Sequence, residues 1–201
     1  MQFNAADAIA LKQFRLAAAY IPDKQNKQAL QAIRQGLKTL NRALKTDPDN
    51  PRLLLLSAML DGQWLLLRPW RFFLNGRRAL NRLSKAEQLT PDNPRATLLR
   101  GTAKVVLPGI FGGNAEEAVA LFNQTLAATD SSGQVFEDSA LCHNGAWAQV
   151  DLLNWLGRAH TKLGQPKQAR QAYLRALHRS PDNYWVKLAM AGQGYEWTEP
   201  D

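Results

Sequence analysis

The strongest constraint on the fold is a tripeptide, Pro-Asp-Asn, that recurs along the chain at Pro48–Asn50, Pro91–Asn93 and Pro181–Asn183. The intervals between the copies are 43 and 90 residues, about one and two periods of roughly 45 residues. Self-similarity at such a period is typical of helical repeat arrays, in which each unit buries its apolar face against its neighbours. The sequence therefore predicts a further, diverged unit that ends near residue 130, where the turn-forming segment ATDSSG lies.

A helix is predicted directly before each copy of the tripeptide. Small and apolar residues recur there at offsets i, i+4 and i+7, which form one stripe of an amphipathic helix. Proline then ends the helix, because the residue before a proline disfavours the helical region, and the Asp and Asn side chains can cap the helix that follows. The three stripes are Gly36, Leu40 and Ala43; Ala79, Leu83 and Ala86; and Ala169, Tyr173 and Ala176.

The last unit, residues 150–181, resembles a tetratricopeptide repeat (TPR) at nearly every signature position of that motif. His160 is a mild departure, because the motif usually has Tyr there. The earlier units keep the second-helix pattern and the closing proline, and Gly101 keeps the small residue of the first helix. The resemblance covers residues 17–190 in all. The matching positions of the last unit are Leu153, Leu156, Gly157, Gly164, Ala169, Tyr173, Ala176 and Pro181.

These patterns predict an all-α fold: a right-handed superhelical array of about four TPR-like helix-turn-helix repeats with a C-terminal capping helix. The whole chain, residues 1–201, is expected to form a single α-solenoid domain. Its repeats are predicted at residues 4–50, 51–93, 94–133 and 145–183, and the capping helix at residues 184–193.

Residues 107–114, LPGIFGGN, are rich in glycine and could form a phosphate-binding loop or a joint between helices. A P-loop follows a strand and carries Lys and Ser/Thr after its glycines, whereas here a helical pattern precedes and no such Lys follows. Asn114 and Glu117 have the spacing of a capping pair, which would occupy the amides that an anion needs. The stretch is therefore interpreted as the joint between the two helices of the third repeat.

This joint and the tail SPDNYWVKLAMAG are similar to a subset of bacterial cell-envelope TPR proteins that includes the T-component proteins of TRAP transporters. The resemblance implies a periplasmic or lipid-anchored protein that associates with a solute-binding partner. A cytoplasmic location is the alternative, because residues 1–14 lack the basic and apolar regions of a signal peptide. No lipid-anchor cysteine is visible, which leaves the anchoring open.

The net charge of +8 is unevenly distributed along the chain. Residues 1–110 contain 18 Lys and Arg against 7 Asp and Glu, whereas residues 111–201 contain 7 against 10. A basic half suggests an acidic partner, either a protein, an anionic lipid surface or nucleic acid, unless the surplus lies on solvated helix faces. Two basic stripes are expected mostly to face solvent on the convex side of the array: Arg34, Lys38, Arg42 and Lys45, and Arg78, Arg82 and Lys85.

Residues 63–78, QWLLLRPWRFFLNGRR, interleave aromatic and basic side chains around Pro69. Such a composition suits contact with a partner or ligand, with an anionic membrane surface or, least favoured, with nucleic acid. The alternative is an extended joint in which Trp and Phe pack on neighbouring helices beneath Arg stems. Three residues of this joint, Trp64, Trp70 and Arg71, are predicted binding residues.

The first helices of a TPR array line its concave groove, and this arrangement predicts further binding residues. Asn154 and Arg158 echo the Lys, Asn and Arg set with which some TPR domains grip a C-terminal carboxylate. The next unit lacks the matching Lys and Arg, so no such clamp is predicted. The groove residues chosen are Arg52, Met59, Arg95, Thr102, Asn154 and Arg158.

Catalytic and metal chemistry have little support in the sequence. Cys142 and His143 are neighbours, which do not face one site on a helix, and a four-ligand zinc set is absent. The predicted function is a non-enzymatic protein–protein interaction scaffold that uses the TPR groove, with no cofactor or metal. The alternative is a periplasmic carrier that binds a small apolar ligand between the repeats and residues 63–78.

Overall fold

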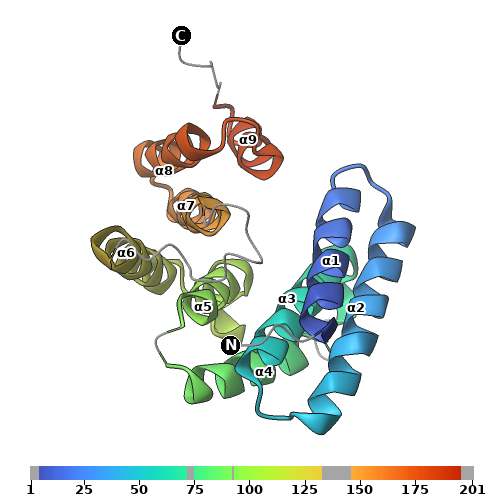
Figure 1. The fold of residues 1–201 in the computed structure, drawn as a ribbon. Helices are drawn as coiled ribbons and strands as arrows, with labels where there is room; N and C mark the ends of the chain where they lie inside the picture. Colours follow the sequence, from blue (N-terminus) through green and yellow to red (C-terminus); the bar gives the residue numbers. More distant parts are fainter. Residues whose placement is uncertain (1–4, 72–74, 92, 133–145, 196–201) are drawn as a thin grey trace. The chain divides into compact units, whose positions relative to one another are not determined.

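The computed structural model describes residues 5–71, 75–91, 93–132 and 146–195, and the regular structure in these ranges is helical throughout (Figure 1). The chain divides into two compact units, Met1–Ala96 and Thr97–Asp201. The predicted all-α class and the packing of successive helices against one another are confirmed. The assignment of the whole chain to a single domain stays a prediction.

In the first unit, α3 is the central helix. It packs on α1, α2 and α4, and α1 also packs on α2. Leu53–Leu56 are all buried, as expected for a helix without a continuous polar face. Gly36 lets α2 approach α3 closely, because a Cβ atom there would lie 2.7 Å from Cδ1 of Leu60. The elements are α1, Ala5–Tyr20; α2, Asn26–Thr46; α3, Pro51–Leu67; the 3-10 helix η1, Pro69–Arg71; and α4, Arg77–Leu89.

In the second unit, α7 packs on α6, α8 and α9. A Cβ atom on Gly157 of α7 would overlap the ring of Tyr173 on α8. One on Gly101 of α5 would likewise overlap the ring of Phe122 on α6, so the same glycine–aromatic contact closes both hairpins. The elements are α5, Pro94–Val106, which begins at the boundary between the units; the 3-10 helix η3, Gly109–Phe111; α6, Ala115–Ser132; α7, Ala146–Lys162; α8, Pro166–Arg179; and α9, Tyr184–Ala191.

The asparagine of each Pro-Asp-Asn tripeptide caps the helix that follows, as predicted. Oδ1 of Asn50 accepts two backbone N–H bonds from the first turn of α3, at 3.1 and 3.2 Å. Asn93 and Asn183 accept in the same way at the starts of α5 and α9, at 3.0 and 3.1 Å. The expectation that the aspartate also caps is wrong at Asp49, whose carboxylate pairs with Lys85 of α4 instead.

Residues 107–114 join α5 to α6, as predicted. Gly112 has a φ of 88°, a left-handed conformation that glycine adopts without strain. Oδ1 of Asn114 accepts the N–H of Glu117 at 2.9 Å, which is the first half of the predicted capping pair. The second half is not formed, because the Asn114 N–H donates to the Lys104 carbonyl and the Glu117 carboxylate pairs with the Lys104 ammonium group at 2.7 Å.

Candidate interaction site

Four cationic side chains lie along one face of α2, because offsets of four and three residues return to the same side of a helix. Arg34, Lys38, Arg42 and Lys45 are all exposed, while the opposite face of α2 is buried in the core. None of the four forms an ion pair with another residue that the structure describes. At 1.5 Å per residue, the row is about 16 Å long.

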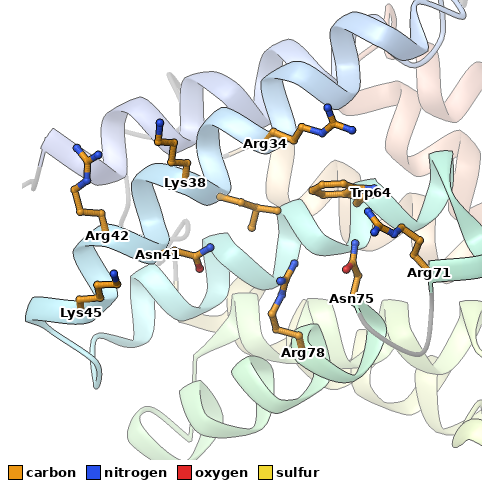
Figure 2. A pocket seen from close by; sticks show the side chains of 10 residues that line it. Arg34, Lys38, Asn41, Arg42, Lys45, Trp64, Arg71, Asn75 and Arg78 are labelled. Carbon is orange, nitrogen blue, oxygen red and sulfur yellow. The ribbon is translucent and has the colours of Figure 1, made fainter.

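Trp64, near the end of α3, holds two of the cationic groups in place. The guanidinium carbons of Arg34 and Arg71 each lie 5.7 Å from the centre of the Trp64 ring. Figure 2 shows the ring between these two side chains. A cation–π contact of this kind stabilises a guanidinium position by about 0.5–1 kcal/mol at an exposed site and leaves its charge uncompensated. Both arginines therefore keep a full charge in a restricted position.

The carboxylate of Asp61, which is 0% exposed, anchors the start of α4 to α3. Nε of Arg78 and Nη1 of Arg82 each donate to Oδ2 of Asp61 at 2.9 Å, and Nη2 of Arg78 donates to its Oδ1. Hydrogen bonding to Asp61 raises the pKa of Arg78, whereas desolvation lowers the pKa of Arg82. The expectation that this stripe faces solvent is wrong for Arg82, because a buried carboxylate on α3 draws it inward.

Asn75 precedes α4 and is 6% exposed. Its Nδ2 atom is buried and has no hydrogen-bond partner among the described residues. A buried donor without an acceptor costs about 1–3 kcal/mol. In Figure 2 the Asn75 side chain lies below Trp64, between Arg71 and Arg78.

These side chains line one pocket of about 780 Å³ in the first unit, which we call the basic pocket (Figure 2). Six of its ten lining residues are cationic and none is a carboxylate, so positive charge is concentrated on its wall. The lining residues are Arg34, Leu37, Lys38, Asn41, Arg42, Lys45, Trp64, Arg71, Asn75 and Arg78.

Two of the predicted joint residues, Trp64 and Arg71, line the basic pocket. The third, Trp70, is 67% exposed and is not part of the lining. The guanidinium carbon of Arg68 lies 5.0 Å from the centre of the Trp70 ring. A binding role for Trp64, Trp70 and Arg71 stays a prediction.

The predicted groove residues of the first unit lie outside the basic pocket. Arg52 and Met59 are on α3, where the Nε atom of Arg52 forms an ion pair with Asp7 of α1 at 3.2 Å. Arg95 is in the first turn of α5. A binding role for Arg52, Met59 and Arg95 stays a prediction.

The remaining groove residues lie in the second unit. Thr102 is a half-buried residue of α5, and Asn154 is a buried residue of α7 whose Oδ1 lacks a partner within the described ranges. The guanidinium carbon of Arg158 on α7 lies 5.2 Å from the centre of the Trp155 ring, and desolvation lowers the pKa of Arg158. A binding role for Thr102, Asn154 and Arg158 likewise stays a prediction.

Sequence reasoning missed Asn41, Asn75 and the row on α2 as parts of one site. The row itself was visible in the spacing of Arg34 and Lys38, but its pattern is the same on a plain solvated face. Nothing in the residues around Asn75 indicates that its amide is buried. The contact of Arg71 with Trp64 is local, since η1 directly follows α3.

In the part of the chain that the structure describes, no group of three or more His, Cys, Asp or Glu side chains could hold a metal ion. None of the described helices is both long enough and apolar enough to cross a membrane. Cys142 and His143 lie outside the described residues.

Residues 150–183 match the family model for the tetratricopeptide repeat. The matched range contains most of α7 and all of α8, so it spans the hairpin in which Gly157 meets Tyr173. The comparison with curated proteins gives no match. Residues 150–183 are therefore similar to a TPR, in agreement with the motif positions read from the sequence.

Proposed function

We propose that the chain is a non-enzymatic interaction module that docks an acidic segment of a partner protein in the basic pocket. A TPR suggests a protein–protein interaction scaffold. The single observation that carries the proposal is the group of five cationic side chains that line one pocket and have no ion pair among the described residues. These are Arg34, Lys38, Arg42, Lys45 and Arg71.

Such a concentration of like charge destabilises the isolated protein through mutual repulsion, and a bound anion relieves it. The row on α2 is about 16 Å long, and an extended segment rises about 3.3 Å per residue. About five residues of a partner can therefore lie along the row. Because the cations are exposed, the attraction should weaken as salt shortens the Debye length from about 10 Å at 0.1 M.

Fluorescence anisotropy with a labelled peptide that alternates Asp and Gly tests this proposal. The peptide should bind, and its affinity should fall when Lys38 and Arg42 are both changed to Gln. A peptide with Asn in place of every Asp should not bind. The matched control is Lys167→Gln with Arg170→Gln, which removes two exposed cations from α8 and should leave the affinity unchanged. Equal loss in both double variants, or no binding of the acidic peptide, rejects the docking site.

A location in the bacterial cell envelope is part of the same proposal. It is supported by the similarity of residues 107–114 and of the tail to envelope TPR proteins. Immunodetection of the native protein in osmotic-shock, membrane and cytoplasmic fractions tests the location. Recovery in the cytoplasmic fraction alone would reject it.

The carrier of a small apolar ligand is the alternative, but no described observation favours it. Eight of the ten lining residues of the basic pocket carry a charged or amide group, which an apolar ligand would desolvate without compensation. Native mass spectrometry of gently purified protein decides between the two. A reproducible mass excess that organic solvent removes would support the carrier, and a bare mass is expected for the interaction module.

A further inference from the structure

We propose that the end of α3 and the turn that follows it bind an anionic membrane surface, with apolar side chains beneath the lipid headgroups and arginines among them. The residues that carry this contact, which we call the hairpin tip, are Leu66, Arg68, Trp70, Arg71 and Arg77. Only Arg71 of these five lines the basic pocket, so the inference goes beyond the proposed function.

Two large apolar side chains of the hairpin tip are exposed to water. Leu66, in the last turn of α3, is 57% exposed, and Trp70, in η1, is 67% exposed. An indole ring suits the membrane–water interface, because it is largely apolar and has one polar N–H group. The guanidinium carbon of Arg68 lies 5.0 Å from the centre of the Trp70 ring, so a cation accompanies the exposed ring. Arginine stems can lie along apolar surface while their charged ends stay among headgroups.

Positive charge at the hairpin tip is not compensated by neighbouring residues. Residues 62–86 contain six arginines and lysines and no aspartate or glutamate. Three of these cations pair with Asp61 or Asp49. Anionic lipid headgroups would supply a counter-charge for the others. The other three are exposed and form no ion pair with another described residue: Arg68, Arg71 and Arg77.

The joint between α5 and α6 also exposes apolar side chains but lacks this charge. Val106 and Ile110 are 53% and 87% exposed. Residues 105–157 contain no Lys or Arg, and Lys104 pairs with Glu117 of α6. Anionic headgroups would therefore gain no counter-charge at this joint. At the hairpin tip, exposed apolar surface and uncompensated cations occur together, and this charge complementarity favours an anionic lipid surface.

A lipid surface satisfies both features of the hairpin tip, because acyl chains lie directly beneath the charged headgroups. An acidic protein segment would neutralise the arginines but would leave Leu66 and Trp70 in water. The contact is therefore assigned to lipid, and the basic pocket remains the site proposed for an acidic protein segment.

Cosedimentation of the full chain with vesicles of phosphatidylcholine, with and without phosphatidylserine, tests the proposal. The protein should bind the vesicles that contain phosphatidylserine, and Leu66→Ser with Trp70→Ser should lower its partition coefficient at least about tenfold. The matched control is Val106→Ser with Ile110→Ser, which removes two exposed apolar side chains from the second unit and should leave partition unchanged. Far-UV circular dichroism checks that both double variants keep the helical fold.

Two further variants separate the charge from the inserted ring. Arg68→Gln with Arg77→Gln removes two cations that do not line the basic pocket, and it should lower partition about tenfold. Trp70→Phe keeps an aromatic side chain and should retain partition within about twofold. It should nevertheless reduce the blue shift of tryptophan emission that vesicles induce, because the ring that enters the interface is then no longer an indole.

The peptide assay distinguishes the hairpin tip from the basic pocket. Leu66→Ser with Trp70→Ser should keep the affinity for the acidic peptide, because neither residue lines the pocket. Loss of peptide and vesicle binding together would mean that the pocket holds the lipid, and this overturns the hairpin tip.

Three other results also overturn the proposal. These are no binding to vesicles with phosphatidylserine, equal binding to vesicles without it, and equal loss of partition in the two serine double variants. None of them affects the docking of an acidic segment, which the peptide assay measures independently.

Discussion

Two helix hairpins of the molecule solve the same packing problem with different chemistry. In the α7–α8 hairpin, Gly157 leaves room for the ring of Tyr173, and the contact is between apolar atoms. In the α3–α4 hairpin, Asp61 lies buried on the first helix and receives hydrogen bonds from Arg78 and Arg82 of the second. The first hairpin is the one that matches the TPR family model.

The difference shows how a repeat can acquire a charged surface without losing its fold. The contact between Gly157 and the Tyr173 ring buries no charge, so the α7–α8 hairpin needs no cationic side chain at this position. A buried carboxylate requires compensating donors, because an unpaired charge in the interior is strongly destabilising. Arg78 and Arg82 meet this requirement, and Arg78 also reaches the wall of the basic pocket.

The largest effect is expected from Asp61→Asn. It leaves two arginines without their counter-charge, and breaking a buried pair in this way costs about 3–5 kcal/mol. Because the side chain of Arg78 is 42% exposed, we expect a loss near the lower end, about 3 kcal/mol. Urea unfolding followed by circular dichroism measures the free energy of unfolding.

The control for Asp61 is Asp182→Asn. The side chain of Asp182 is 97% exposed and lies 3.7 Å from the Lys187 ammonium nitrogen. Its removal should change the free energy of unfolding by less than about 0.5 kcal/mol. A loss below about 1 kcal/mol for Asp61→Asn would mean that α4 does not depend on the buried ion cluster.

The next effect concerns the apolar hairpin. Gly157→Ala should lower the free energy of unfolding by about 2 kcal/mol, because the added methyl group overlaps the Tyr173 ring and overpacking costs about 1–3 kcal/mol. Gly62→Ala is the matched change on α3, where a Cβ atom meets nothing within 4 Å. It should instead raise the stability by about 0.5–1 kcal/mol, since Ala is the better helix former. A loss of equal size at both positions would contradict the close approach in α7–α8.

A second carboxylate sharpens the comparison with Asp61. Asp151 of α7 has no hydrogen bond or ion pair with another described residue, and burial raises its pKa from 3.8 to about 7. The folded state therefore favours the protonated form. The resulting destabilisation is absent below pH 4, grows as the pH rises from 4 to 7 and is complete above pH 7.

Asp151→Asn removes this destabilisation. The full pKa difference corresponds to about 4 kcal/mol, but the side chain is only half-buried and water screens part of the effect, so we expect a gain of about 2 kcal/mol at pH 8. The gain should vanish at pH 4. Urea unfolding of both proteins at pH 4, 6 and 8 measures it, and a gain that does not change with pH would contradict the assignment to protonation.

The features that sequence predicted correctly are local ones. The helix stripe that contains Ala169 and Tyr173, the Asn caps and the joint at residues 107–114 all depend on residues within a few positions of one another. Helical periodicity, proline geometry and side-chain capping act over that range, so single-chain patterns express them directly. Gly157 and Tyr173 are farther apart, but they belong to a motif whose hairpin geometry is already fixed.

The features that sequence did not predict depend on distant pairs. Asp61 and Arg82 are 21 residues apart, and nothing near either one indicates that the other is its partner. The row on α2 has the spacing of an ordinary solvated face, and it becomes a pocket wall only because Trp64 and η1 lie opposite it. Charge patterning alone cannot distinguish a solvated helix face from the wall of a pocket, since the cationic side chains are exposed in both.

The smallest effect tests whether the caps of the two units are equivalent. Asn50→Ala and Asn183→Ala should each lower the free energy of unfolding by about 1 kcal/mol, because each removes the side-chain acceptor at a helix start. Asn50 accepts two backbone bonds and donates to Asp47 at 2.8 Å, whereas Asn183 accepts one, so Asn50→Ala should cost more by a few tenths of a kcal/mol. Asn183→Asp keeps the acceptor and places a negative charge at the helix N-terminus, so it should retain the stability of the parent protein. Equal losses for Asn183→Ala and Asn183→Asp would show that the side-chain acceptor at this position does not stabilise α9.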